Sequence, residues 1–516
     1  MHPVESARLK SKRAALCSLF VVASCFLVLR VPLMYRQSGG QDEDWFSVPG
    51  FTIATEGVPR VPYAPERRRE SVFYKADQVL TALPPAFFYA QAPCFHVLPP
   101  GFGTARLPSA IAGLVAIWLV YRLALMLVGD ETTAVAAAAL YSLSRVFYFP
   151  ATMARPDMLC GMFGLAALCA TLNWSRRPTL LRLVSSGVLC GLGLLTHPFA
   201  IVFCLQIGVW VMWRSPDWRR SLLHGALLTA AALIVLSAWL PLILMDTDAF
   251  RHQFIDNVFD RPEPGTLWRI LWPWPYLPHQ VELVGERTGT WQGLLMLAGL
   301  VFIAWDAVRR RSPGTVLLAW LTFSSLYLMV ACLGLHASKG YWCYPGALVM
   351  ICVAGTLSRL SELLFRRLRY RAVVWSAAVL VMLPGLGLRT WVAHVRHWND
   401  PNYDSRRFTR LLMERFPQEE RLAVDPAYVF DAWLLHRNVI LGVEAERYFE
   451  VGQFDFDKLI VARYGFDNDL PDRLGTTLVS RFGAKDDLFA CYAEVYEPSL
   501  EEVSEANSDD NSDGDP

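Results

Sequence analysis

Residues 14–44 read AALCSLFVVASCFLVLRVPLMYRQSGGQDED, an apolar run that ends in three acidic residues. A helix needs about 20 mainly apolar residues to cross a bilayer, and the stretch from Ala14 to Tyr35 is long enough. Asp42, Glu43 and Asp44 follow almost at once, where lipid gives way to water. Carboxylates at that boundary are costly unless a function needs them. We therefore interpret them as candidates for chemistry at the membrane surface.

The composition of the whole chain agrees with a membrane protein. Of its 516 residues, 54% are hydrophobic and 18% are charged, whereas soluble proteins carry about 25% charged residues. The pattern predicts an α-helical polytopic membrane protein with about eleven transmembrane helices. The predicted helices cover residues 14–34, 105–127, 133–149, 157–173, 179–195, 198–214, 221–245, 290–308, 313–335, 343–364 and 371–390.

The basic residues predict the orientation of these helices, because Lys and Arg resist crossing the membrane. The chain starts with a basic segment, and every second loop or its border is basic again. These positions are Arg8, Lys10, Lys12, Arg13, Arg122, Arg176, Arg177, Arg214, Arg219, Arg220, Arg309, Arg310, Arg311, Arg366, Arg367, Arg369 and Arg371. The N-terminus is therefore expected in the cytoplasm, and the acidic cluster, residues 246–289 and the region beyond 391 are expected outside.

Net charge and cysteine content argue against a nucleic-acid-binding protein and against a disulfide-stabilised fold. The net charge of +1 gives no indication of a nucleic-acid partner. Most of the 11 cysteines lie in predicted helices, no C-x-x-C pair occurs, and an odd total argues against a disulfide framework. A bridge among Cys94, Cys343 and Cys491 stays open. The first apolar stretch continues past Cys25 to Met34, so we expect a retained anchor rather than a cleaved signal.

Changes in composition predict three regions. Residues 1–397 form the transmembrane module, with a long first outer loop at 35–104, and Pro84–Val97 in that loop predicts a helix lying in the membrane interface. Residues 398–497 contain short β-like runs at 422–424, 439–441 and 459–462, with a helical stretch between the first two, which predicts a small extracytoplasmic α/β domain. Residues 498–516 are acidic and are predicted to be disordered.

Ionisable and aromatic residues gather at the predicted outer ends of later helices. Taken singly, such residues interact with lipid headgroups or form the aromatic belt. Their convergence on one face indicates a site, where cations could bind a lipid phosphate. The candidates are Arg106, Arg155, Asp157, His197, Arg251, His252, Lys339, Tyr341 and Tyr344.

The acidic pair after the first helix resembles the polytopic GT-C glycosyltransferases. The similar branch is the dolichyl-phosphate-mannose-protein-mannosyltransferase-like one, which includes bacterial aminoarabinose transferases. Three more stretches resemble that branch over roughly residues 14–390. They are Arg106-Leu107-Pro108-Ser109-Ala110 followed by Tyr121-Arg122 and Gly129, Tyr148 through Ala154-Arg155-Pro156-Asp157, and Pro84-Pro85 before an aromatic run.

The resemblance implies transfer of a sugar from a polyprenyl-phosphate donor to an envelope acceptor (a lipid, a glycan or a protein). It implies a site on the periplasmic face of the cell inner membrane. Asp42 would be the base or would orient the acceptor, and Glu43 would assist it or bind a divalent metal ion, whose involvement stays open. Donor phosphate or substrate would be bound by Lys75, Arg106, Arg155, Asp157, Lys339 and Tyr341.

Two other classes remain as alternatives. A multi-spanning transporter of an envelope lipid or glycan precursor would place ionisable residues at mid-bilayer, whereas the predicted helix centres here carry almost no charge. An assembly protein would use the α/β region to recruit partners and would not need the acidic cluster beside the first helix. Both differences favour an enzyme acting at the membrane surface.

Overall fold

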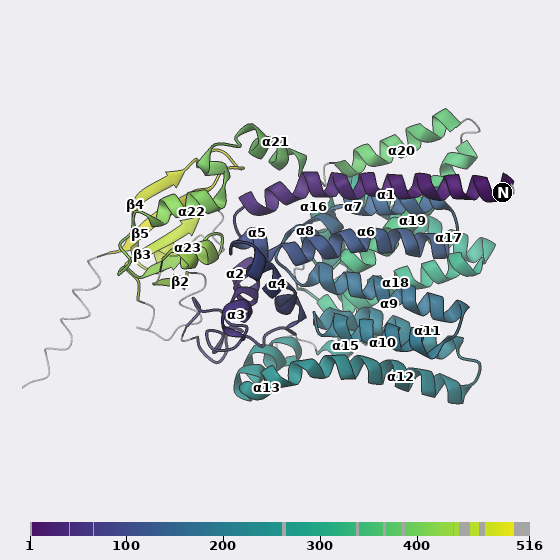
Figure 1. Cartoon of the computed structure of the whole chain (residues 1–516), viewed down its shortest axis with the longest axis horizontal. Helices are drawn as coiled ribbons and strands as arrows, with labels where there is room; N and C mark the ends of the chain where they lie inside the picture. The colour runs from purple at the N-terminus through teal and green to yellow at the C-terminus, as the bar shows by residue number, and fades with distance from the viewer. Residues whose placement is uncertain are drawn as a thin grey trace, which may run out of the picture.

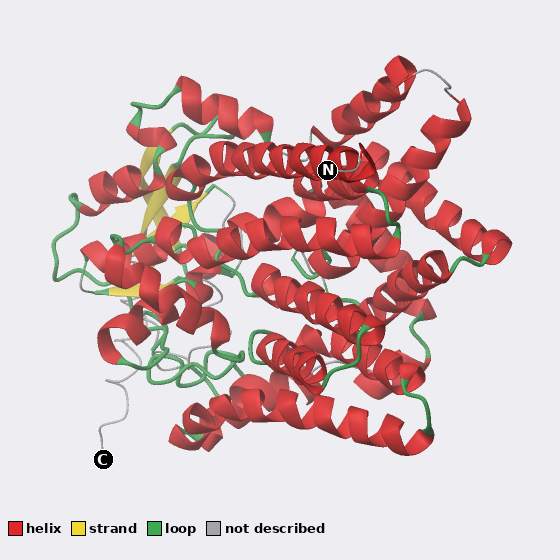
Figure 2. Cartoon of the chain, turned by 45° about the vertical axis from the view of Figure 1, so that its right-hand side comes forward, coloured by secondary structure: helices red, strands yellow, loops and turns green. Residues whose placement is uncertain are grey.

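The computed structural model describes residues 3–40, 42–65, 67–260, 265–336, 340–364, 368–383, 387–436, 438–442, 455–463 and 470–499. Long helices lie side by side in a bundle, and a small sheet lies at one end of it (Figures 1 and 2). Many side chains on the outside of the bundle are apolar and exposed, among them Phe20 (74%), Leu181 (76%) and Val308 (74%). Such a surface is stable in lipid, and the chain is a multi-spanning membrane protein.

Seven helices in the described part of the chain are long and apolar enough to span a bilayer. They are α1 (Pro3–Arg36), α6 (Leu107–Leu127), α9 (Asp157–Arg176), α12 (Trp218–Leu236) continued by α13 (Leu240–Met245), α17 (Thr290–Arg310), α18 (Pro313–Leu333) and α19 (Cys343–Leu364). An eighth span results if α7 (Glu131–Leu143) and α8 (Arg145–Thr152), bent by 61°, are taken together. Three shorter apolar helices occupy other predicted positions: α10 (Leu180–Leu194), α11 (Ile201–Arg214) and α20 (Leu368–Met382). The count of eleven spans therefore stays a prediction.

Two predicted spans differ in shape from the expectation. The span expected over 133–149 is interrupted at Ser144, whose backbone is extended (φ −76°, ψ 151°). The span expected over 371–390 has its helix end at Met382, just before Pro384, a residue that cannot continue a helix without losing a backbone hydrogen bond.

The loop between α1 and α6, which the sequence predicts to be the first outer loop, forms short helices outside the bundle. They are α2 (Glu43–Phe46), α3 (Val48–Glu56), α4 (Ala86–Val97) and α5 (Phe102–Ala105). The helix predicted over Pro84–Val97 is confirmed as α4, which begins after Pro85. Its position in the membrane interface stays a prediction. A later outer segment contains α14 (Thr247–Phe250), the π-helix η3 (Arg251–Asp260), α15 (Thr266–Leu271) and α16 (Leu277–Thr288).

The C-terminal region has the predicted α/β character. The sheet has the order β2-β1-β3-β5-β4, in which β1 pairs in parallel with β2 and β3, and β5 is antiparallel to β3 and β4. Its strands are β1 (Leu422–Val424), β2 (Val439–Leu441), β3 (Lys458–Ala462), β4 (Thr476–Gly483) and β5 (Tyr492–Pro498). Helices α21 (Leu388–Arg396), α22 (Ser405–Met413), α23 (Val429–Leu435) and α25 (Leu470–Arg473) accompany it. The first three strands are those expected from sequence, whereas the β4–β5 hairpin was not predicted. Of residues 498–516, which were expected to be disordered, Pro498 ends β5 and Ser499 N–H donates to the Gly475 carbonyl (2.9 Å), and residues 500–516 lie outside the described part.

The sheet is joined to the first outer loop through the carboxyl ends of its strands. Just after β1, the Ala427 carbonyl accepts a hydrogen bond from Gly39 N–H (2.8 Å), and at the end of β2 Leu441 N–H donates to the Tyr63 carbonyl (2.7 Å). Arg36, the last residue of α1, donates to backbone carbonyls of the segment before the sheet. These bonds hold the α/β region against the loop that carries the acidic cluster.

Two buried aspartates make this region sensitive to pH. Burial raises the pKa of Asp425 and of Asp431 to about 6. Because the folded-state pKa lies above the unfolded value near 3.8, the stabilisation is complete below about pH 4 and is lost as the pH rises through 6. The pKa of Glu494, in the same sheet, is lowered to about 2, so this residue adds only a small slope of the opposite sign near pH 5, where its unfolded form begins to take up protons.

We therefore expect the α/β region to gain stability when the pH falls from 7.5 to 5, and Asp425→Asn to remove about half of that gain. Each aspartate contributes on the order of 1–3 kcal/mol over the interval. Hydrogen exchange of peptides covering β1 and β3, corrected for intrinsic rates, measures the effect. Asp486→Asn, at an exposed position, is the matched control. Equal pH slopes in wild type and Asp425→Asn would show that Asp425 is not the titrating group.

Candidate active site

Asp42 occupies the turn that follows α1. Its backbone is left-handed (φ 63°, ψ 1°), a conformation that costs energy for a residue with a side chain and that clusters at functional sites. One carboxylate oxygen pairs with Nη1 of Arg155, and the side chain keeps 34% of its surface exposed. Asp42 is thus both anchored and accessible.

Glu43 is the buried member of the pair, with no exposed surface. Its Oε1 accepts Arg106 Nε (2.8 Å) and the backbone N–H of Ala154 (2.5 Å), and its Oε2 accepts Arg106 Nη2 (2.6 Å) and Gly40 N–H (2.9 Å). A carboxylate offers about four acceptor sites, and all are used. The geometry leaves Glu43 no open position for a metal ion or a substrate.

Arg106, in the turn between α5 and α6, completes this buried pair. Besides Glu43, it donates to the carbonyls of Met34 (2.6 Å), Gln37 (3.0 Å) and Ser38 (2.7 Å). These three carbonyls belong to the end of α1 and the turn after it, so Arg106 fixes the turn that carries Asp42. Its five N–H donors are all occupied by these partners, and the expected contact of Arg106 with a donor phosphate stays a prediction.

Arg155 forms ion pairs with two carboxylates, those of Asp42 and Asp157. The side chain is 3% exposed, its Nε donates to Asp157 Oδ2 (2.7 Å), and its Nη1 pairs with Asp42. Phe46 and Tyr341 flank the guanidinium, each with a ring centroid 5.6 Å from its central carbon. Burial opposes the charge, but Asp157 and Asp42 hold the pKa of Arg155 well above its ordinary value. The result is a permanent cation between two anions.

Lys75 lies in a separate cluster of the outer loops. Its backbone is also left-handed (φ 56°), and its Nζ contacts Asp246 (3.0 Å) and Asp248 (3.2 Å) at the start of α14. The hydrogen bond to Asp246 raises the pKa of Lys75. Tyr74 donates to the same Asp248 (3.0 Å). Lys75 therefore joins the first outer loop to the segment before η3, and no described interaction links it to Asp42 or Arg155.

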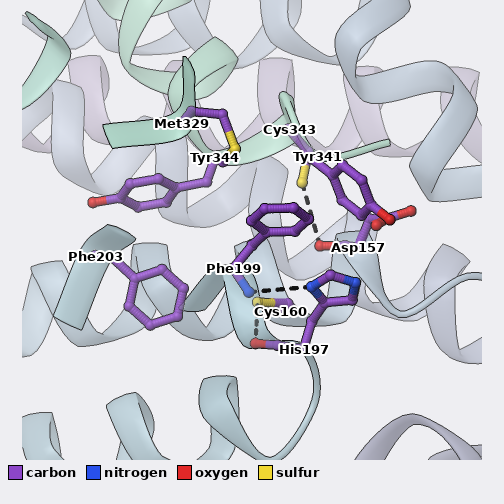
Figure 3. A pocket seen from close by; sticks show the side chains of 10 residues that line it. Asp157, Cys160, His197, Phe199, Phe203, Met329, Tyr341, Cys343 and Tyr344 are labelled. Atoms are coloured by element: carbon purple, nitrogen blue, oxygen red, sulfur yellow. Dashed lines mark hydrogen bonds between the residues drawn. The ribbon is translucent and has the colours of Figure 1, made fainter. Parts of the chain in front are cut away.

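A narrow cavity lies beside Asp157 (Figure 3). Its lining includes His197, Phe199, Phe203, Met329 and Tyr344, with Asp157 and Tyr341 on one side. The Tyr341 ring packs on the rings of Phe199 (4.2 Å between centroids) and His197 (5.0 Å). Burial lowers the pKa of His197 to about 3, so its imidazole is neutral. Tyr341, Asp157 and Arg155 thus come together as predicted from their outer positions, whereas Lys339 lies outside the described residues.

Comparison with known proteins adds to this geometry. The family model of dolichyl-phosphate-mannose-protein mannosyltransferases matches residues 82–244. The undecaprenyl phosphate-alpha-4-amino-4-deoxy-L-arabinose arabinosyl transferase of Pseudomonas aeruginosa is 31% identical over 224 residues, which is 42% of this chain and 39% of the relative. That of Erwinia tasmaniensis is 25% identical over 234 residues, 44% and 41% of the two chains. The chain thus matches about two fifths of the length of these relatives.

Solved structures extend the similarity to nearly the whole chain. ArnT from Cupriavidus metallidurans, crystallised with undecaprenyl phosphate, superposes with a TM-score of 0.56 at 16% identity, covering 95% of this chain and 98% of ArnT. The archaeal oligosaccharyltransferase AglB from Archaeoglobus fulgidus superposes with a TM-score of 0.52 at 13% identity, covering 95% and 75%. The chain has the GT-C fold. The resemblance drawn from the sequence motifs is thereby confirmed at the level of fold.

Several residues that line the cavity were not among the candidates predicted from the sequence. Phe199, Phe203, Met329 and Cys160 line the cavity, but in the sequence they are ordinary apolar residues at the outer ends of spanning helices. They belong to the hydrophobic core or pack against it, and only the structure shows that they also line one cavity. His197, by contrast, was a candidate from the sequence, because it is a polar residue just before Pro198 in a predicted outer turn.

The described residues contain no three His, Cys, Asp or Glu side chains close enough together to hold a metal ion. Glu43, the predicted ligand, has its oxygens occupied by Arg106 and backbone groups.

Proposed function

We propose that this protein is a membrane glycosyltransferase that moves a sugar from a polyprenyl-phosphate donor to an envelope acceptor. The observation that carries the proposal is the partly exposed Asp42 carboxylate, held in a left-handed turn against a buried Arg155 that also binds Asp157. The names of the relatives support the donor class, since they specify undecaprenyl phosphate and a transferred aminoarabinose. The sugar and acceptor of this chain are a separate question.

In the proposed reaction the acceptor hydroxyl attacks the anomeric carbon from the side opposite the phosphate. The bond between the acceptor oxygen and the anomeric carbon forms as the bond between that carbon and the phosphate oxygen breaks. The electron pair of the broken bond leaves with polyprenyl phosphate. Asp42 takes the hydroxyl proton through its second carboxylate oxygen, which has no described partner. Arg155 stabilises the negative charge that develops on the leaving phosphate. Such a displacement inverts the anomeric centre.

The other candidates receive narrower roles in this proposal. Glu43 and Arg106 hold the turn that carries Asp42, while Asp157 orients Arg155. Tyr341 and Lys339 stay proposed donor contacts, and Lys75 would contribute only after leaving Asp246. We also keep the division into a transmembrane module (1–397) and an α/β region (398–497). The α/β region lies against the loop that follows α1, and this position supports a role of the α/β region in selecting the acceptor.

We further propose that the chain lies in the cell inner membrane, with its N-terminus in the cytoplasm and its α/β region in the periplasm. The N-terminus lies at the end of the bundle opposite the sheet (Figure 1). Basic residues at the ends of α9, α11 and α17, namely Arg176, Arg214 and Arg310, support the same orientation.

The test is to incubate the purified full chain with a panel of polyprenyl-phosphate sugars and a crude envelope acceptor fraction, and to measure free polyprenyl phosphate. We expect release from at least one donor, and a fall of about 100-fold or more in Arg155→Gln, since removal of one charge-stabilising group has cost that much elsewhere. Arg145→Gln, at an exposed position ten residues earlier, is the control. Donor movement across vesicles without any release would favour a transporter.

A further inference from the structure

A groove of about 340 Å³ lies between α1, α7 and α20, toward the end of α1 that holds the N-terminus (Figure 1). It is distinct from the cavity beside Asp157, and the reaction proposed above uses none of the residues that line it. Its walls include Ala14 and Ser18 of α1, Val135 and Ala139 of α7, and Trp375 and Val379 of α20.

Small side chains keep this groove open. The sequence of α7 contains five alanines between residues 134 and 139. Ala138 is fully buried against the bundle, whereas Ala139 is half-buried and lines the groove. From α1 the groove is lined by Ala14 and Ser18, which are both exposed. Such short side chains do not reach across from one helix to the next, so the protein itself leaves the space unfilled.

The groove begins at the level of the lipid headgroups. Its charged lining residue, Glu131, is the first residue of α7 and accepts a hydrogen bond from the Tyr121 hydroxyl (2.6 Å). Lys12 and Arg13 directly precede Ala14 and are exposed. Basic residues at the end of a membrane-spanning helix place their charges among the headgroups. The groove therefore has a polar end at the membrane surface and an apolar part that continues into the bilayer.

The length of the groove indicates what fits in it. The lining residues of α7 run from Glu131 to Leu140, a rise of about 14 Å along a helix. The hydrocarbon core of a bilayer is about 30 Å thick, so one leaflet contributes roughly half of that. The groove thus matches the depth of a single leaflet, which is the reach of one lipid tail.

The position of the groove separates it from the proposed donor site. From Ser18 to Arg36, the last residue of α1, the helix rises by about 27 Å, which is nearly the thickness of the hydrocarbon core. Asp42 lies beyond Arg36, at the opposite membrane surface. A polyprenyl-phosphate donor has its phosphate at that surface, so the lipid that enters the groove from the N-terminal end of α1 is a different one.

We propose that this groove binds one acyl chain of a phospholipid from the leaflet at the N-terminal end of α1. The surrounding hydrocarbon is as apolar as the groove, so binding depends on packing: a tail that fills the space gives the lining atoms the contacts that they otherwise lack. The exposed cations Lys12 and Arg13 attract the lipid phosphate at the polar end. The bound tail joins α20 to α1 and α7.

The experiment uses the full chain purified in mild detergent, with retained phospholipid counted by native mass spectrometry. Ala139→Phe and Ser18→Phe fill the groove from two different helices, and each is expected to retain about tenfold less phospholipid than wild type, because the ring takes the place of the tail. Neither position is fully buried, so the ring enters the groove rather than the core. Ala230→Phe, at an exposed position of α12, should retain the wild-type amount.

A second arm locates the bound tail. Wild type and variants are placed in nanodiscs of phosphatidylethanolamine and phosphatidylglycerol, in which part of the phosphatidylglycerol carries a photoreactive diazirine on one acyl chain. We expect cross-links within residues 131–140 and 375–379 of wild type, and about tenfold fewer in Ala139→Phe. Equal lipid retention and equal cross-linking in wild type, Ala139→Phe and Ser18→Phe would overturn the proposal. Displacement of the cross-links by undecaprenyl phosphate would also overturn it, because the groove would then bind a polyprenyl chain.

Discussion

Arg106→Met is expected to destabilise the protein by about 3–5 kcal/mol, because it leaves the buried Glu43 carboxylate without its cation. The same change removes three bonds to the carbonyls that end α1. The turn that carries Asp42 then loses its support, so activity should fall together with stability. Unfolding of the detergent-solubilised chain by SDS, followed by tryptophan fluorescence, measures the loss.

Two further variants distinguish the loss of the buried Glu43–Arg106 ion pair from a nonspecific loss of stability. Glu43→Gln combined with Arg106→Met removes both charges and should recover part of the lost stability. Glu56→Gln breaks a solvent-accessible ion pair with Arg60, which lies beyond the end of α3, and such pairs are worth about 0.2–1 kcal/mol. If Arg106→Met were no more harmful than Glu56→Gln, the buried pair would not support the fold.

Asp42→Asn is expected to lower the rate of sugar transfer by about 10²–10⁴-fold, the usual contribution of a general base. The amide keeps the size of the side chain and can still accept a hydrogen bond from Arg155, but it cannot take a proton from the acceptor hydroxyl. The chain should fold and bind donor as before. Transfer kinetics under saturating donor, alongside SDS unfolding, separate the two effects.

Asp486→Asn provides the matched control for that change. It makes the same chemical substitution at an exposed outer position and should leave the rate within a factor of two of wild type. A loss of stability in Asp42→Asn equal to its loss of rate would instead assign Asp42 a structural role toward Arg155.

The sequence predicted the fold class because its signals were local. Apolar runs identified the spanning helices, and the β-like runs at 422–424 and 439–441 coincide with β1 and β2. The β4–β5 hairpin was missed because β4 is largely exposed and both strands mix polar with apolar side chains, as at Arg481 and Glu494. A local pattern carries little information about a strand of that kind.

The candidate site was predictable only in part. From their positions at the predicted outer helix ends, four residues were expected to lie close together. In the structure Arg155 contacts the other three, which are Asp42, Asp157 and Tyr341. Sequence could not show that Glu43, adjacent to Asp42, points into the protein and binds Arg106. That difference depends on the left-handed backbone at Asp42, which turns successive side chains in opposite directions. A contact between residues 43 and 106 has no local signature.

The most direct test compares wild type and Asp42→Asn on one radiolabelled polyprenyl-phosphate sugar, with labelled sugar on the acceptor and free polyprenyl phosphate both measured. The account predicts that the two products appear in equal amounts in wild type and fall together by about 100-fold or more in the folded variant. Transfer by Asp42→Asn at the wild-type rate would contradict it, as would a wild-type chain that binds the donor and releases neither product.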